Sequence, residues 1–248
     1  TALILLYGNW QYHNKKRSHI TIKTEKIEKP VRIVGISDLH LGYTISKKEL
    51  NRWVEMINAE NPDMVIIGGD LVDNQFRPVW RHSLDKELRK INAPLGIYAC
   101  TGNHEYISGI KNSIDFYARS GITLLRDSVL QTNGLTIIGR EDHSRQNRKT
   151  LRELIKDSNN RTFSILLNHQ PYDLDETVRE RIDFQFSGHT HRGQVFPASL
   201  ITDKIFELSQ GYLQKENTHF YVSSGLGIWG GKFRIGTRSE YLVLDLVN

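Results

Sequence analysis

Acidic and imidazole side chains stand at short spacings at several points of the chain. Asp38 and His40 are two residues apart, and His189 and His191 have the same spacing. On extended backbone, side chains at i and i+2 point the same way, so Asp38 and His40 could share one ligand. Carboxylate and imidazole groups side by side are typical ligands of divalent metal ions. The spacing therefore indicates metal chemistry.

Further side chains of metal-binding type occur between these pairs. They are Asp70, Asn103, His104 and His169. Glycine, which allows sharp turns and close backbone approach to a ligand, precedes four of the five groups. The chain has one cysteine, Cys100, which excludes an internal disulfide and any zinc-finger spacing. Any metal must therefore be held by His, Asp and Asn.

Each of the five groups follows an apolar run that predicts a buried strand. The runs cover residues 31–37, 63–68, 95–100, 163–167 and 183–186. Helical periodicity separates the first three, with one apolar stripe after Ser46 and another from Trp80 to Ile91. This alternation predicts parallel strands with right-handed crossovers. Such sheets carry their sites at the carboxyl ends of the strands, where the candidate ligands stand.

Other local patterns complete the predicted element order. Two capping boxes, Ser46–Glu49 and Thr150–Glu153, predict helix starts. An edge strand is expected at 19–26. Further strands are expected near 122–131, 135–139, 219–223 and 240–246.

Length and composition are those of an ordinary globular protein. The chain has 248 residues, of which 38% are hydrophobic and 25% charged. These values fit one compact domain, which we expect from residue 18 onward. The net charge of +5 suits an anionic substrate or surface, and equally a soluble surface with a few extra Lys and Arg.

Residues 1–17 differ from the rest. An apolar start (ALILLY) gives way to Trp10 and then to the basic cluster Lys15-Lys16-Arg17. This order is typical of a transmembrane helix leaving the bilayer, although the piece is too short to span by itself. We therefore expect a membrane-proximal segment and a membrane-associated protein, attached through an upstream segment. The alternative is a short helix packed on the domain.

In combination, the motifs resemble those of the calcineurin-like metallophosphoesterases. The chain contains, in order, D-x-H at 38–40, G-D-x-x-D at 69–73, G-N-H-E at 102–105, a lone histidine at 169 and G-H-x-H at 188–191. The resemblance implies an α/β fold, a four-layer αββα sandwich with two mixed β-sheets. Residues 18–248 would then form the metallophosphoesterase domain.

The resemblance also implies a site for two divalent ions, with Mn, Fe or Zn as candidates and Mg also compatible. For the first ion the ligands would be Asp38, His40 and His191, and for the second Asn103, His169 and His189. Asp70 would bridge the two ions. Paired ions lower the pKa of a bridging water, and the resulting hydroxide attacks phosphorus in line with the leaving group.

Two further residues would be catalytic. The resemblance makes His104 the general acid for the leaving oxygen, or a donor to a phosphoryl oxygen. Asp73 would orient His104, with turn capping as the alternative role for this residue. Glu105 is expected to be structural.

Details of the motifs favour one branch of the superfamily. Asn74 stands where the protein Ser/Thr phosphatases have Arg, which disfavours that branch. The sequence after G-H-T-H is similar to a bacterial phosphodiesterase branch with membrane-attached members. It departs from that branch at Arg192, where Gly is common, and at Ser239, where Pro is usual. Arg192 is either a phosphate contact or a surface residue.

An apolar set follows the last ligand motif, and we expect it to be core or, if exposed, a surface for lipid or acyl chains. Its members are Leu200, Ile201, Ile205, Phe206, Ile228 and Trp229. The predicted function is hydrolysis of a small or lipid-linked phosphate ester by a phosphodiesterase or pyrophosphatase. The alternatives are a metal-dependent nuclease and a non-catalytic binding protein of the same fold. Scattered Lys and Arg argue against nucleic acid as a partner.

Overall fold

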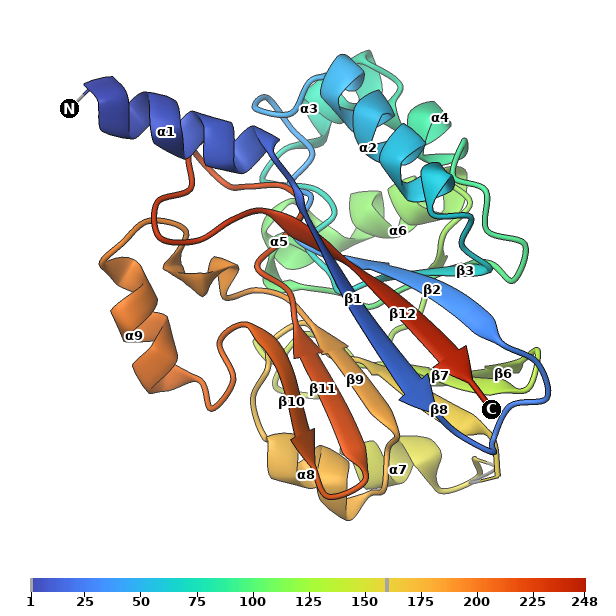
Figure 1. The fold of residues 1–248 in the computed structure, drawn as a ribbon. Helices are drawn as coiled ribbons and strands as arrows, with labels where there is room; N and C mark the ends of the chain where they lie inside the picture. Colours follow the sequence, from blue (N-terminus) through green and yellow to red (C-terminus); the bar gives the residue numbers. More distant parts are fainter. Residues whose placement is uncertain (1, 159–160) are drawn as a thin grey trace.

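Two six-stranded sheets form the centre of the molecule (Figure 1). The computed structural model describes residues 2–158 and 161–248. In spatial order, the first sheet consists of β1 (Lys16–Lys23), β12 (Glu240–Val247), β2 (Val31–Ile36), β3 (Met64–Ile67), β4 (Ile97–Ala99) and β5 (Thr123–Leu124). The second consists of β10 (Gly211–Lys215), β11 (Thr218–Val222), β9 (Phe184–Ser187), β8 (Phe163–Leu167), β7 (Leu135–Gly139) and β6 (Ser128–Thr132).

Both sheets are mixed, as expected. Strands β2 to β5 are parallel, and β12 joins them in antiparallel pairing with β2. In the second sheet, β11, β9, β8 and β7 are parallel, with antiparallel strands at both edges. The parallel strands of each sheet therefore end at a common edge, and the predicted ligand groups follow five of these strands.

Helices cover the outer face of each sheet (Figure 1). Over the first sheet lie α2 (Lys47–Ala59), α3 (Phe76–Arg81), α4 (Leu84–Leu88) and α6 (Ile110–Arg119), and under the second lie α7 (Leu151–Ile155) and α8 (Leu174–Arg179). The helices α1 (Ala2–His13), α5 (Asn103–Ile107) and α9 (Ala198–Ile205) and the short 3₁₀ turn η1 (His191–Gly193) lie outside these layers. The four-layer αββα prediction is confirmed.

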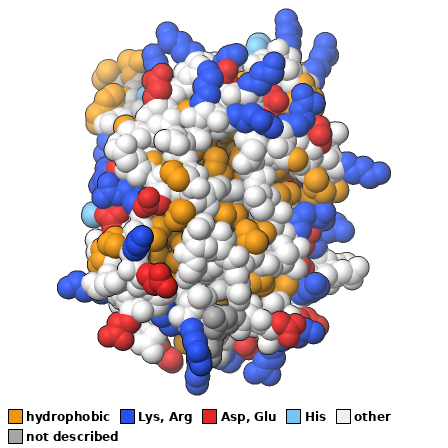
Figure 2. Space-filling view, turned by 90° about the vertical axis from the view of Figure 1, so that its right-hand side faces the viewer, with side chains coloured by type: hydrophobic (Ala, Val, Ile, Leu, Met, Phe, Trp, Pro, Cys, Tyr) orange, Lys and Arg blue, Asp and Glu red, His pale blue; other side chains and the backbone are white. Residues whose placement is uncertain are grey.

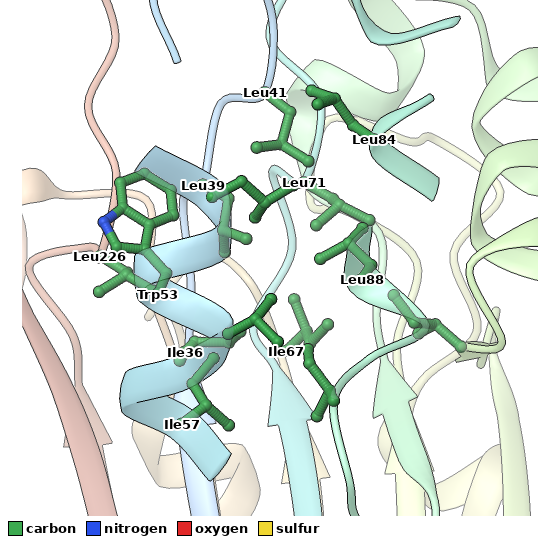
Figure 3. Packing of buried hydrophobic residues seen from close by; sticks show 14 of the residues in the cluster. Ile36, Leu39, Leu41, Trp53, Ile57, Ile67, Leu71, Leu84, Leu88 and Leu226 are labelled. Carbon is green, nitrogen blue, oxygen red and sulfur yellow. The ribbon is translucent and has the colours of Figure 1, made fainter. Parts of the chain in front are cut away.

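Alternation along the strands explains the layers. In β3, Met64 and Ile66 belong to the core between the sheets, whereas Val65 and Ile67 belong to the core beneath the helices. Figure 3 shows Ile67 in that second core, together with Trp53 of α2 and other apolar side chains. A strand buried on both faces has no polar position, which is why these runs are continuously apolar.

Glycine permits the close approach of the sheets. A Cβ on Gly35 of β2 would lie 2.9 Å from the Phe186 ring, and one on Gly68 would lie 3.1 Å from it. The ring of Phe186 in β9 therefore packs directly on the backbone of the first sheet. This contact fixes the distance between the strand ends that carry the ligands.

Two local predictions were wrong in detail. The stretch from Trp80 to Ile91 forms two short helices instead of one, because Ser83 lies between them with φ +51°. The capping box at Thr150 is complete. At Ser46 only the hydroxyl bonds to the backbone of Glu49, whose carboxylate instead accepts from Tyr12 and Lys232.

The first residues form helix α1, which packs on the domain through the fully buried Tyr12. The backbone carbonyl of Gly8 accepts a 2.9 Å hydrogen bond from the amide of Arg234. Strand β1 begins at Lys16, so the first sheet already includes the last two residues of the predicted segment 1–17. The division of the chain after residue 17 remains a prediction.

Candidate metal centre

The loops after β2, β3, β4, β8 and β9 converge at one edge of the two sheets. They bring together two groups of donor atoms. Within each group the ligand atoms lie within 4.8 Å of one another, and the groups are Asp38, His40 and His191, and Asp70, His169 and His189. Six of the seven predicted ligands therefore meet in the two groups that the resemblance implied.

The first group is tightly packed. The Nε2 atoms of His40 and His191 lie 3.1 Å apart, and Asp38 Oδ1 lies 3.4 Å from the Nε2 of His191. All three side chains are buried. Two ligand atoms about 2.1 Å from one ion and at right angles are about 3.0 Å apart, so these spacings fit a metal site.

The predicted amide ligand, Asn103, lies next to the second group. Nε2 of His169 lies 3.1 Å from Asp70 Oδ2, and Nδ1 of His189 lies 3.0 Å from the Oδ1 of Asn103. The Nδ1 of His169 donates to the carbonyl of Gly68 at 2.6 Å. That bond leaves Nε2 as the coordinating nitrogen, the usual arrangement for a histidine ligand.

Asp70 lies between the two groups. The same oxygen, Oδ2, is 3.1 Å from His169 Nε2 and 3.8 Å from His40 Nε2, while Oδ1 accepts the backbone N–H of His104 at 2.9 Å. One carboxylate thus faces donors of both groups, as a bridging ligand must. The buried Nε2 of His169 has no hydrogen-bond partner among the described residues, and an ion would supply one.

The ligands reach this geometry through strained backbone. Five of them have φ in the left-handed region: Asp38 (53°), His40 (48°), Asp70 (53°), His189 (70°) and His191 (47°). The expectation that Asp38 and His40 lie on extended backbone was therefore wrong. Residues other than glycine are uncommon in that region, although Asp and His occupy it more often than most, and such conformations cluster at functional sites.

Two glycines leave room for the carboxylates. A Cβ on Gly102 would lie 2.2 Å from Asp70 Oδ1, and one on Gly188 would lie 2.3 Å from Asp38 Oδ2. Any side chain at these positions would displace a ligand. This explains why glycine immediately precedes Asn103 and His189.

Burial and neighbouring charges shift the pKa values of the candidate ligands in different directions. Burial opposes charge on His169, but the Asp70 carboxylate raises its pKa well above the usual value. Burial, helped by the charge of His169, lowers the pKa of His189 to about 4, and burial lowers the pKa of His191 well below its usual value. Both rings are therefore neutral, the form that coordinates metals. Burial alone would raise the pKa of the Asp70 carboxyl, but the imidazoles around it, His169 first, hold that pKa below its ordinary value. Asp70 is thus ionised.

His104 lies beside the two groups, at the wall of a cavity of about 500 Å³. Its Nδ1 lies 2.9 Å from the backbone carbonyl of Asp73 and 3.3 Å from the Asp73 carboxylate. A carbonyl can only accept, so Nδ1 carries the hydrogen and Nε2 is left for the cavity. Burial opposes charge on this ring, but the Asp73 hydrogen bond and the charge of Asp70 raise its pKa to about 9.

A third grouping, of His40, Asp73 and His104, also brings three donor atoms within 4.8 Å. It is a poor metal site. The Nδ1 of His104 is engaged with the Asp73 carbonyl, and His40 already faces the first group through Nε2. Asp73 Oδ1 lies 3.5 Å from His40 Nδ1, so this carboxylate is placed to orient both rings.

Glu105 is fully buried and holds two ligand loops together. Its carboxylate accepts the backbone N–H groups of Asp70 at 3.0 Å, Leu71 at 2.8 Å and Gly102 at 2.6 Å, and the hydroxyl of Tyr117 at 3.2 Å. Its type and position in the sequence predicted only a structural role. The only indication of these hydrogen bonds in the sequence was the position of Glu105 in the G-N-H-E motif.

Arg234 was missed as part of the site. Its side chain is fully buried and donates to the carbonyls of His191 (2.9 Å), Ser224 (2.7 Å) and Gly227 (2.9 Å). It therefore anchors the loop that carries His191 to the loop after β11. All three acceptors are backbone carbonyls, so no residue type in the sequence indicated these contacts.

Comparisons with known proteins agree with this geometry. The family model for the calcineurin-like phosphoesterases matches residues 31–193. The chain is 33% identical over 236 residues to an uncharacterised metallophosphoesterase of Helicobacter pylori, covering 91% of this chain and 62% of that protein. A solved structure of TT1561 from Thermus thermophilus shares the fold, with a TM-score of 0.51 at 11% identity over 79% of this chain and 90% of that one.

The chain belongs to the calcineurin-like phosphoesterase family. Its grouped Asp and His side chains could hold metal ions. It spans less than two thirds of the length of the Helicobacter relative. A Danio rerio relative, 31% identical over 97% of this chain and 59% of its own length, is named a transmembrane protein with a metallophosphoesterase domain. Among residues 2–158 and 161–248, no helix is long and apolar enough to cross a bilayer.

The basic cluster at 15–17 does not form one exposed patch. Lys15 Nζ packs over the ring of Tyr12 at 3.6 Å, and Arg17 forms a 2.8 Å ion pair with Glu60. The Nη1 of Arg192 donates a 3.3 Å hydrogen bond to the side-chain oxygen of Gln210.

Proposed function

We propose that the chain is a dinuclear phosphodiesterase or pyrophosphatase that hydrolyses a small or lipid-linked phosphate ester. The observation that carries the proposal is the position of Asp70, whose one oxygen faces ligand atoms of both groups. When bound, two divalent ions would activate a water for attack on phosphorus and neutralise the phosphoryl oxygens.

The chain's own residues then have separate tasks. Asp38, Asp70 and the four imidazoles of His40, His169, His189 and His191 would hold the ions. Asn103 adds a neutral ligand, which limits the negative charge facing an anionic ester. His104, protonated at neutral pH, can give its Nε2 hydrogen to the leaving oxygen, and Asp73 fixes its orientation through Nδ1.

The surroundings of the cavity support a lipid-linked substrate. Trp229 lines the cavity and is 54% exposed, and Leu200 and Ile201 of α9 are 55% and 61% exposed. Of the apolar set predicted from the sequence, Phe206 and Ile228 are buried and the other four are exposed. An exposed apolar group of this kind, next to a site, suits acyl chains or a membrane surface.

Helix α1 extends the same surface. Its Leu3 and Leu6 are 80% and 67% exposed, and Gly8 packs against Ile235, whose carbonyl accepts from Phe196 just before α9. Figure 1 shows α1 and α9 on the same side of the molecule. We therefore propose that the protein works at a membrane, which the name of the Danio rerio relative also favours.

A nuclease has less support. In the sequence, Lys and Arg are scattered and are not interleaved with aromatic residues as in a groove for nucleic acid. Figure 2 draws one face of the molecule, the right-hand side of Figure 1, and Lys and Arg are scattered there too. We propose that nucleic acid is not the substrate.

Hydrolysis assays on diesters with two leaving groups test the role of His104. The wild type, supplied with Mn²⁺, should hydrolyse both a nitrophenyl diester and an alkyl diester. His104→Asn should lose about 10²- to 10⁴-fold in kcat with the alkyl group and less with nitrophenolate, which leaves without a proton. An Asp70→Ala variant as active as the wild type would refute the proposal.

A further inference from the structure

A second cavity, of about 510 Å³, lies at the edge of the second sheet that also carries the metal centre. In this sheet β9 and β8 lead to His189 and His169, and the next strand is β7. Residues 140–149 follow β7 and line the cavity together with α8. The cavity is therefore one strand further along the edge than the metal centre.

The lining is rich in cations. They are Arg140, Arg145, Arg148, Lys149 and Arg179. Three acidic residues also line the cavity, but two are already paired. Asp175 lies 2.6 Å from the Nζ of Lys215, outside the cavity, and Glu176 lies 2.6 Å from Arg140. Positive charge is thus in excess, which favours an anionic ligand.

Two of the arginines, Arg140 and the half-buried Arg148, have a buried Nε without a hydrogen-bond partner among the described residues. The side chain of Arg140 is 8% exposed, and its Nε has no partner among the described residues although its other nitrogens bind Glu176 and the Lys149 carbonyl. Arg148 Nε is also buried without a partner. Native proteins rarely leave buried donors unpaired, and anion oxygens would satisfy both. Burial, together with the charge of Arg140, lowers the pKa of Arg148 to about 10.

The cavity is connected to the metal centre. Arg148 Nη2 donates to the Oδ1 of Asn168 at 2.6 Å, and Asn168 directly precedes the ligand His169. A row of rings also joins the two places. His143 packs on Tyr172 at 4.7 Å, Tyr172 on Phe206 at 4.9 Å, and Phe206 on the ligand His189 at 6.2 Å.

We propose that this cavity binds a phosphate group, the second anionic group of a substrate whose ester phosphate lies at the metal centre. The proposal rests on the proposed function for that ester. Guanidinium groups match phosphate through paired hydrogen bonds, which is why phosphate is the ligand expected for several arginines. The row of rings between the two places offers a wall for the part of the substrate that joins its two phosphates.

Calorimetric titration of the full metal-loaded chain with inorganic phosphate tests the cavity. The wild type should bind phosphate at two sites, one at the metals and one in the cavity. Arg148→Gln should weaken the cavity site at least tenfold. Because Arg148 contacts the loop of His169, the double variant Lys149→Gln with Arg179→Gln, which changes two exposed side chains, should show the same loss. Arg52→Gln removes an exposed arginine on α2 and should bind like the wild type.

One phosphate site in the wild type, or two undiminished sites in both cavity variants, would overturn the proposal. Two sites in a chain that hydrolyses no ester would contradict the proposed function and leave the cavity site standing.

A pair of substrates tests whether the phosphate in the cavity belongs to the substrate or is free inorganic phosphate. A diester that carries a second phosphate should be preferred over the same diester without it, and the double variant should reduce that ratio of kcat/KM at least tenfold. If phosphate binds but the ratio is one in the wild type, the cavity holds free phosphate, and the assignment to a substrate is wrong.

Discussion

Two acidic neighbours, Asp73 and Asp70, favour the protonated form of His104, and Asp73 is the one that contacts its ring. Asp73 accepts from Nδ1 through its backbone carbonyl, and its carboxylate lies 3.3 Å from the same atom. The hydrogen bond and the charge raise the pKa of His104 to about 9 against the opposing effect of burial. A general acid must be protonated, so activity should be present below that pKa and be lost as the pH rises through it.

Asp73→Asn keeps the backbone carbonyl and removes the charge, so the pKa of His104 should fall. The alkaline limb of the kcat profile should therefore move to lower pH with an alkyl diester. The profile is measured with saturating metal, and Asp115→Asn, which changes an exposed carboxylate on α6, is the matched control. An unmoved limb would mean that Asp73 does not set the protonation of His104.

At the scale of elements, the loops after β3 and β4 are joined by Glu105. Three backbone N–H groups, of Asp70, Leu71 and Gly102, end on this one carboxylate. Each buried donor left without an acceptor costs about 1–3 kcal/mol.

Glu105→Ala should therefore lower the free energy of unfolding by about 3 kcal/mol or more. Glu105→Gln, which keeps an acceptor oxygen, should lose less. Urea unfolding measures both, with Glu55→Ala at an exposed position of α2 as the control, expected near wild type. Equal stability of Glu105→Ala and Glu55→Ala would show that the two loops do not depend on this carboxylate.

The sequence predicted the strands and the ligand types because each apolar run ends at a polar group of metal-binding type. It could not predict the backbone of the ligands. The left-handed φ values of Asp38 and His191 are imposed by the tertiary fold, because no local sequence pattern requires them. Arg234 was equally hidden, because its acceptors are backbone carbonyls, which any sequence offers. The predicted continuous helix 80–91 is interrupted at Ser83, where the chain turns between α3 and α4.

At the scale of the whole molecule, helices α1 and α9, which both carry exposed apolar residues, lie on the same side. If this surface meets a bilayer, the chain should sediment with lipid vesicles. Leu200→Glu with Ile201→Glu should reduce that binding several-fold, since two exposed apolar side chains are replaced by charges. Ile114→Glu, at a 40% exposed position on α6, is the matched control and should sediment like the wild type. Equal sedimentation of all three proteins would contradict the proposal that this surface binds a membrane.

The metal content of the purified chain tests the central claim most directly. After supplementation with Mn²⁺ and removal of free metal, elemental analysis should find two ions per chain in the wild type and fewer in Asp70→Ala, because that variant loses the carboxylate shared by the two groups. Two ions in both proteins would contradict a centre built around Asp70, and so would a wild type that retains none.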